Sequence, residues 1–205
     1  MTTLTLYTHP MSRGRIVRWM LEEVGAPYDT VLLEYGGSMK AADFLAINPM
    51  GKVPAIKHGD TVVTECAAIC AYLADACPER QLAPPPAERG AYYRWLFFAA
   101  GPVEAAVTAK SLGLLAPAEK SGMAGYGSFE QTIDVLEKAV AGSEYIAGDR
   151  FSAADVYVGS QIGWGLMFGT IDKRPAFADY VARLGARPAA QRARALDDAS
   201  LPAKA

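Results

Sequence analysis

The sequence predicts an α+β protein in which a small mixed β-sheet domain is followed by an all-helical domain. Strand-like and helix-like segments alternate over residues 1–78, and no convincing strand pattern appears from Glu88 onward. Pro84-Pro85-Pro86 lies between the two halves and can continue neither a helix nor a sheet. We therefore expect a first domain at 1–78, a linker at 79–87 and a helical domain at 88–205.

The elements of the first half follow from hydrophobic spacing and turn residues. Strands are expected at 4–7, 28–33, 53–57 and 61–64, a long helix from Ile16 to the stop at Gly25, a short helix at 39–46, and a closing helix over 65–76. A βαβ unit followed by a hairpin and a last helix can cover both faces only as a small mixed sheet carrying helices. A thioredoxin-like sheet has this order.

The second half shows only helical patterns. Helices are expected at 88–114, 126–141, 152–168, 175–186 and 188–196, the first of them bent near Gly101-Pro102. Ser152 can cap the third helix, with Asp155 bonding back to it. In this second half of the chain, most of the large apolar residues should lie in the core, and a few should line an apolar pocket. These residues are Tyr92, Tyr93, Trp95, Phe97, Phe98, Trp164, Met167 and Phe168.

Composition narrows the class of partner. Of 205 residues, 51% are hydrophobic and 20% charged, and the net charge of -2 comes with no cluster of Lys and Arg that nucleic acid or a membrane surface would need. The longest uncharged stretch, Val156 to Ile171, is shorter than the roughly 20 residues that span a bilayer. The N-terminal residues lack a secretory signal pattern. We expect a cytoplasmic protein that binds a small molecule, with neither nucleic acid nor membrane as a partner.

The cysteines and histidines give no metal or disulfide pattern. Cys66, Cys70 and Cys77 are odd in number and lie on one predicted helix and its end, which suits a reducing compartment. His9 and His58 stand at no metal-ligand spacing with them. We expect no metal, and we assign His9 no role.

The most informative segment is Asn-Pro-Met-Gly-Lys-Val-Pro at residues 48–54. From the residues alone it could be an edge strand with a trans proline, because only about 5–6% of X-Pro bonds are cis. The segment closely resembles the N-P-x-G-x-V-P loop of cytosolic glutathione transferases, in which this proline is cis. The resemblance implies that the backbone of Val53, before Pro54, pairs with the cysteinyl part of glutathione. Lys52 would face the glycyl carboxylate.

Thr64-Glu65-Cys66 follows at the spacing where that family has a Glu-Ser pair beginning a helix. The resemblance implies that Glu65 holds the ammonium of the γ-glutamyl group, while the N–H groups at residues 65–67 bind its carboxylate. Cys66 replaces the usual serine. Because a thiol is a weak donor, we expect the backbone N–H of Cys66 to make that contact.

The residues from Leu6 to Arg15 should lie beside the sulfur of glutathione. A free thiol has a pKa of about 8.5, and a hydrogen bond to a charged group, worth about 1.5–3 kcal/mol, can lower it together with a helix N-terminus. Ser12 resembles the serine of the serine-type classes and is our preferred donor, although it could be a plain helix cap. Tyr7 resembles the tyrosine of the tyrosine-type classes and is the second candidate, although it could be a packed strand residue.

The resemblance extends to the helix from Glu65 to Leu73 and to the cap at Ser152 and Asp155. It implies a homodimeric glutathione S-transferase that uses glutathione as co-substrate to conjugate or reduce small hydrophobic electrophiles. Two alternatives keep the fold: a glutathione-dependent isomerase or dehalogenase, and a non-catalytic binding or interaction protein.

Overall fold

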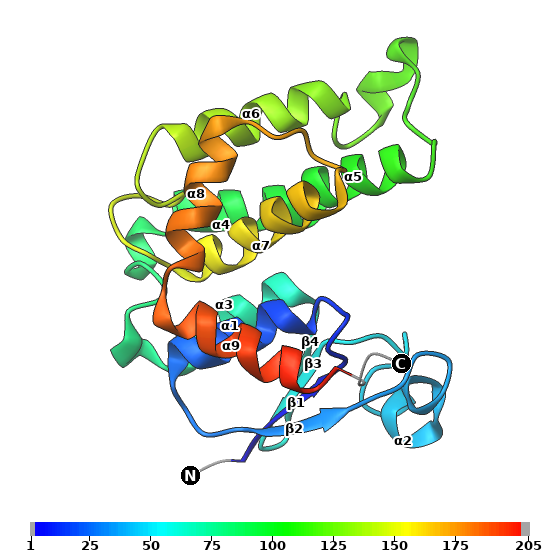
Figure 1. Cartoon of the computed structure of the whole chain (residues 1–205), viewed down its shortest axis with the longest axis vertical. Helices are drawn as coiled ribbons and strands as arrows, with labels where there is room; N and C mark the ends of the chain where they lie inside the picture. The colour runs from blue at the N-terminus through cyan, green and yellow to red at the C-terminus, as the bar shows by residue number, and fades with distance from the viewer. Residues whose placement is uncertain (1–2, 202–205) are drawn as a thin grey trace. The chain divides into compact units, whose positions relative to one another are not determined.

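The computed structural model describes residues 3–201, which form two compact units. The first unit runs to Gln81 and includes the segment from Ala186 onward, and the second runs from Leu82 to Gly185. The first carries a four-stranded mixed sheet and the second is helical (Figure 1), so the predicted fold class is confirmed. The last helix of the chain packs with the sheet-containing unit.

The sheet has strand order β2-β1-β3-β4. Its strands are β1 (Leu4–Thr8), β2 (Asp29–Leu32), β3 (Ala55–His58) and β4 (Thr61–Thr64). β1 and β2 are parallel, whereas β1 with β3 and β3 with β4 are antiparallel. In this register Tyr7 lies opposite Ala55, and Ala55 lies opposite Thr64. The end of β1, the start of β3 and the end of β4 therefore lie at the same edge of the sheet.

The helices of the first unit are α1 (Gly14–Val24), α2 (Ala42–Leu45), α3 (Cys66–Ala76) and α9 (Pro188–Ala199), with short 3-10 turns η1 (Ser38–Lys40) and η2 (Pro78–Arg80). α1 buries one apolar face and ends at Gly25, whose φ of 67° suits a glycine. The single helix expected at 39–46 is wrong in detail. It is split into η1 and α2 because Ala41 has extended backbone, with φ -75° and ψ 152°.

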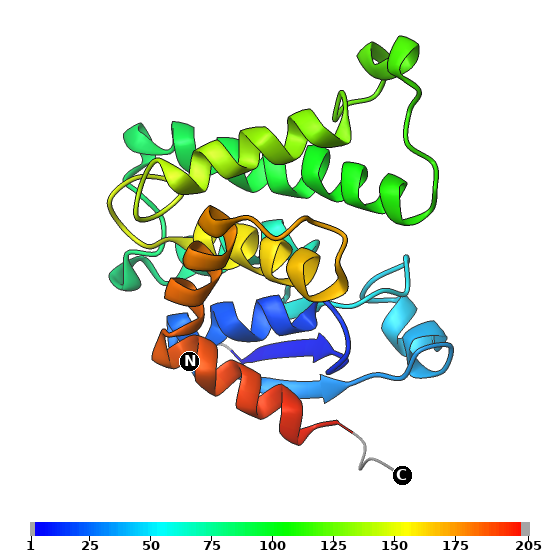
Figure 2. The ribbon, with the colours of Figure 1, turned by 45° about the horizontal axis from the view of Figure 1, so that its top comes forward.

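Helix α9 runs alongside α1 (Figures 1 and 2), although the two are distant in sequence. Within residues 3–201, arginine–carboxylate pairs join the two helices or their flanking residues. These are Arg15 with Asp198, Arg18 with Asp197, Arg187 with Glu23, and Arg192 with Glu22, at N–O distances of 2.7, 2.7, 2.7 and 3.1 Å. These ion pairs hold α9 against α1.

The second unit contains η3 (Pro86–Glu88), α4 (Gly90–Phe98), η4 (Ala99–Val103), α5 (Glu104–Ser111), η5 (Ala118–Met123), α6 (Phe129–Ala141), α7 (Ala153–Phe168) and α8 (Pro175–Gly185). The expected bend is the π-helical segment η4, where Pro102 has no N–H for a helical hydrogen bond. Tyr92 and Trp95 are core as expected, whereas Phe97, Met167 and Phe168 are largely exposed. Every helix within residues 3–201 is too short or too polar to traverse a bilayer.

Candidate active site

Three segments that are distant in sequence meet at the sheet edge where β1 ends. β1 runs into the loop that carries Ser12, Val53-Pro54 directly precedes β3, and β4 runs through Glu65 into α3. A direct contact joins two of these segments, because the Cys66 thiol donates to the Arg13 carbonyl oxygen at 3.4 Å. The fold therefore gathers the predicted thiol-activating and peptide-binding segments around one edge.

Ser12 is buried at the turn that begins α1, with 6% of its surface exposed. Its Oγ donates to the His9 carbonyl oxygen at 2.7 Å and accepts from the Gly14 N–H at 3.0 Å. The helix cap position itself is Arg13, which has helical backbone angles and makes no capping side-chain bond. Ser12 thus fixes the first turn of α1 while its hydroxyl stands beside a helix N-terminus.

Tyr7 lies on the other face of β1 from the buried Leu6 and Thr8. Its ring packs against the cluster of Leu33, Met39, Phe44 and Ala55, at 5.7 Å from the Phe44 ring. The hydroxyl of Tyr7 has no hydrogen-bond partner among residues 3–201. The packing supports a structural role for the ring and leaves the hydroxyl free to act.

The Val53–Pro54 peptide is cis, as the resemblance implies. Asn48 holds the preceding turn: its Nδ2 donates to the Lys52 carbonyl oxygen at 2.8 Å, and its Oδ1 accepts from the Met50 N–H at 3.1 Å. The Lys52 side chain is exposed and makes no ion pair with the described residues. The loop that presents Val53 is therefore braced from within by a buried asparagine, and Lys52 is free to meet an anion.

Two further residues shape the same turn, and the pattern of the sequence did not assign them this role. Lys40 donates through Nζ to the Gly51 carbonyl oxygen at 2.8 Å and to that of Met50 at 3.1 Å. Gly51 has φ 58°, and a Cβ there would lie 2.7 Å from the Met39 carbonyl oxygen. Lys40 is thus a brace of the loop.

Glu65 connects β4 to α3 with a φ of 68°, a conformation that non-glycine residues rarely adopt. Such backbone costs of order 1–3 kcal/mol and tends to occur at functional sites. Its side chain is exposed and so available to a ligand. Cys66 follows as the first residue of α3 and is buried, which places its N–H at the positive end of the helix dipole.

Thr8 is a residue that the sequence pattern did not single out. Its Oγ1 is buried and has no hydrogen-bond partner among residues 3–201. A Cβ built on Gly14 would stand only 1.8 Å from this oxygen, so α1 can approach β1 this closely only because residue 14 is glycine. The glycine between two arginines was the one signal for this contact.

The structure indicates no catalytic role for Cys70 or His9. Cys70 is fully buried, and its burial raises the pKa of the thiol to about 12, which favours the protonated form and suits a packing residue. The His9 ring accepts from the Met11 N–H at 3.1 Å, and its centroid lies 4.6 Å from that of the Tyr35 ring. The described part of the chain holds no group of His, Cys, Asp and Glu that could bind a metal.

Comparison with known proteins places this geometry in a family. Residues 2–75 match the model of the glutathione S-transferase N-terminal domain. The chain is 31% identical to Glutathione S-transferase 3 of Zea mays over 166 residues, covering 76% of this chain and 75% of the maize protein. A glutathione transferase from Methylococcus capsulatus superposes with a TM-score of 0.78 at 30% identity, over 96% of this chain and 100% of that one.

A sphingomonad glutathione S-transferase in complex with glutathione superposes with a TM-score of 0.75 at 30% identity, covering 95% of this chain and 98% of that one. Together with the identity to the maize protein and the cis-proline loop beside a serine at a helix start, this similarity confirms the predicted family: the chain belongs to the glutathione S-transferases.

Proposed function

We propose that this chain is a glutathione S-transferase that binds glutathione along the sheet edge and activates its thiol with Ser12. The observation that carries the proposal is the pairing of β1, β3 and β4, which brings Ser12, the cis Val53–Pro54 peptide and Glu65 to one edge. The comparisons support glutathione transferase activity with glutathione as the co-substrate. Binding of the tripeptide and activation of its thiol then share one edge of the sheet.

Glutathione is held mainly by backbone. The N–H and C=O of Val53 pair with the cysteinyl unit as a short antiparallel strand, with Pro54 fixing the turn and Asn48 bracing it. The γ-glutamyl carboxylate lies on the N–H groups that begin α3, at Cys66, and the γ-glutamyl ammonium pairs with Glu65. Lys52 faces the glycyl carboxylate. Both ends of the tripeptide then meet a group of opposite charge.

Ser12 activates the thiol by exchanging one hydrogen bond for another. Its hydroxyl now donates to the neutral His9 carbonyl, a bond worth about 1 kcal/mol net, whereas a bond to a thiolate is worth about 1.5–3 kcal/mol. Rotation of the hydroxyl toward sulfur is therefore favourable once the thiolate is present. The bond from the Gly14 N–H to Ser12 Oγ polarises the hydroxyl and keeps the oxygen in place.

The thiolate then attacks an electrophilic carbon, adding to an activated double bond or displacing a leaving group, or it attacks a peroxide oxygen, so that the O–O bond breaks and the alkoxide leaves and is protonated to an alcohol. The substrate class is a small hydrophobic electrophile, and its pocket belongs to the helical region that we place at 88–205, after a first domain at 1–78 and a linker at 79–87. Phe97, Met167 and Phe168 offer exposed apolar surface in that region. We further propose a homodimer and a cytoplasmic location.

The test replaces each candidate donor by its closest analogue lacking the hydroxyl. Ser12→Ala should raise the pKa of bound glutathione by about one to two units, the equivalent of one charged hydrogen bond. It should also lower kcat/KM by about 10- to 100-fold. Tyr7→Phe keeps the packed ring and should change the pKa by less than about 0.3 units and kcat/KM by less than about twofold. The reverse result would transfer the role to Tyr7, and no effect from either variant would exclude both.

Two assays distinguish the alternative functions, the isomerase or dehalogenase and the non-catalytic binding protein. Turnover of isomerisable or halogenated substrates without net conjugation would show the isomerase or dehalogenase. Calorimetric binding of glutathione with no turnover on any electrophile would show the non-catalytic protein.

A further inference from the structure

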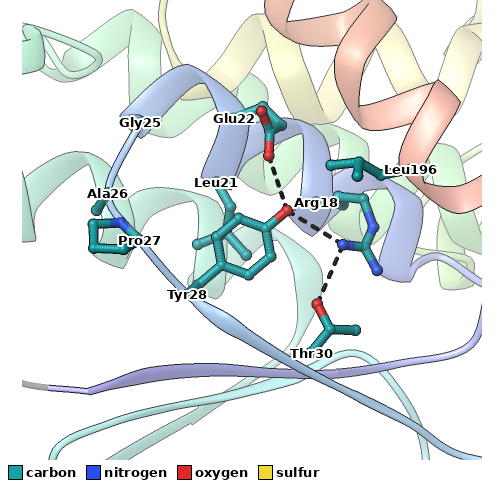
Figure 3. Close-up of a pocket in the computed structure, with 9 residues that line it drawn as sticks. All are labelled: Arg18, Leu21, Glu22, Gly25, Ala26, Pro27, Tyr28, Thr30 and Leu196. Atoms are coloured by element: carbon teal, nitrogen blue, oxygen red, sulfur yellow. Dashed lines mark hydrogen bonds between the residues drawn. The ribbon is translucent and has the colours of Figure 1, made fainter.

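A hollow lies in the first unit, away from the residues assigned to glutathione. It is formed by α1, the connection from α1 to β2, Thr30 of β2 and Leu196 of α9, and its volume is about 580 Å³ (Figure 3). Small-molecule sites occupy about 300–1,000 Å³. Neither Ser12 nor the 53–54 loop lines it, and Glu22 stands about 12 Å along α1 from Gly14 at 1.5 Å per residue.

The inner end of the hollow is rich in donors. Arg18 is only 4% exposed, and its Nε donates to Asp197 Oδ1 at 2.7 Å. Its Nη1 donates to the Tyr28 hydroxyl at 3.2 Å and to Thr30 Oγ1 at 3.3 Å (Figure 3). Its Nη2 has no hydrogen-bond partner among residues 3–201. Because Thr30 accepts from Arg18, its own O–H also remains available as a donor.

The other polar group is an acceptor. The Tyr28 hydroxyl donates to Glu22 Oε1 at 2.9 Å, and Glu22 Oε2 accepts from Arg192 at 3.1 Å. Burial, with the bond to Glu22, raises the pKa of Tyr28 to about 12, so Tyr28 keeps its proton and the arrangement persists at neutral pH. A carboxylate has about four lone-pair sites, so Glu22 can accept a further hydrogen bond.

The charges around the hollow cancel. Arg18 pairs with Asp197, and Glu22 pairs with Arg192. An anionic ligand would face Glu22 and a cationic ligand would face Arg18, so neither sign is favoured. Because the polar groups offer donors at one place and an acceptor at another, the group that fits is uncharged and carries both functions. An amide has this combination.

The rest of the lining is largely apolar: Pro27 and Leu196 are exposed there, and the buried Leu21 lies behind them (Figure 3). Such a surface can bind a flat hydrophobic group such as an aromatic ring. We propose that this hollow binds small uncharged aromatic amides, with the carbonyl toward Arg18 and Thr30, the N–H toward Glu22, and the ring on the apolar wall. The ligand is not the electrophile or the tripeptide of the transferase reaction.

The test uses three probes of one shape in the full chain: benzamide, benzoate and benzylamine. Amide chemical shifts are followed by NMR without glutathione and again at saturating glutathione. In both conditions, benzamide should change the amide chemical shifts of Ala26, Thr30 and Leu196 until the site is saturated. Its affinity should be about fivefold or more above that of the two charged probes. Equal affinities, shifts centred on Ser12 and Val53, or displacement by glutathione would each overturn the proposal.

A matched pair of variants tests the hydrogen bond. Thr30→Val keeps the shape of an exposed strand residue and removes the hydroxyl, so benzamide affinity should fall about three- to tenfold. Thr61→Val makes the same change on β4, outside the hollow, and should leave the affinity unchanged. An unchanged affinity in Thr30→Val, with Leu196→Trp also unable to block binding, would show that the probe lies elsewhere.

Discussion

Two buried aspartates, one in each unit, are held in opposite ways. Asp155 at the start of α7 accepts four hydrogen bonds, two from Ser152 and one each from the Ile146 N–H and the Tyr180 hydroxyl, at 2.7–3.1 Å. Asp197 on α9 accepts one bond from Arg18, and its Oδ2 is buried with no partner in the described part of the chain. Burial raises the pKa of both carboxyls.

The difference lies in what replaces water around a carboxylate. Around Asp155 four hydrogen-bond donors together stabilise the carboxylate, so the loss of one donor leaves the others in place. Around Asp197 a single hydrogen-bonded counter-ion, Arg18, replaces water, with a weaker electrostatic attraction from Arg15, so removal of Arg18 leaves a buried charge poorly compensated. The buried carboxylate of Asp197 therefore depends on one hydrogen-bonded pair, and that of Asp155 on a network.

The largest effect is expected from Arg18→Met. It should lower the free energy of unfolding by about 3–5 kcal/mol, because Asp197 then stays buried without its hydrogen-bonded counter-ion. Urea unfolding measures this, and the double variant with Asp197→Leu should recover most of the loss. Arg174→Met is the control: its partners Asp134 and Glu137 are 56% and 33% exposed, so the cost should be about 1 kcal/mol or less. Equal costs for the two single variants would contradict the dependence on one buried pair.

Asp155→Ala should come next, with a loss of about 2–4 kcal/mol, since the Ile146 N–H and the Tyr180 hydroxyl are left without their acceptor. The loss is again read from urea unfolding. Asp155→Asn keeps one acceptor oxygen and should cost less. If the asparagine variant costs as much as Arg18→Met, charge matters more to Asp155 than the network description allows.

Removal of one member of the network should cost less still. Ser152→Ala takes away one of the two donors to Asp155 Oδ2 and leaves the Ser152 N–H in place. The expected loss is about 1 kcal/mol, typical of a helix cap. Thermal unfolding of Ser152→Ala, measured in parallel with Asp155→Ala, tests this. A loss of stability equal to that of Asp155→Ala would mean that the other donors do not help to stabilise the carboxylate.

The smallest effect is the dependence on pH. Because the pKa of Asp155 is raised above 3.8 by burial, the folded state retains this proton to higher pH than the unfolded state does. The resulting stabilisation is complete below the unfolded pKa and is lost as pH rises through the folded pKa. The stability of the native chain relative to Asp155→Asn should therefore fall as the pH rises above about 4, the pKa of an unfolded aspartate. A rise over this range would show that the hydrogen bonds lower the pKa instead.

Local signals were sufficient for most of the elements. The helices α6, α7 and α8 were predicted within a few residues of their observed bounds, because apolar spacing and the Ser152 cap are properties of neighbouring residues. The cis peptide at Val53–Pro54 came from resemblance. The short helix at 39–46 failed because the break at Ala41 is set by the packing of the loop, in which Lys40 turns to bond Gly51.

The candidate site was only partly predictable. The sequence suggested Ser12, Tyr7, the 52–54 loop and Glu65 with Cys66, but it could not show that the Ser12 hydroxyl already bonds His9 or that Thr8 faces Gly14 without a partner. Such facts depend on side-chain direction, which spacing along the chain does not supply.

The order of strands and helices, the cap at Asp155 and the likeness of two short segments to a family could all be predicted from the amino-acid sequence, because each depends on residues close together in the chain. The folded chain was needed to show that α9 lies on α1 and that Arg18 meets Asp197, 179 positions away. The physical reason is that an ion pair or a pocket wall depends on distance in space, and apolar burial brings the chain to that distance without leaving a local pattern.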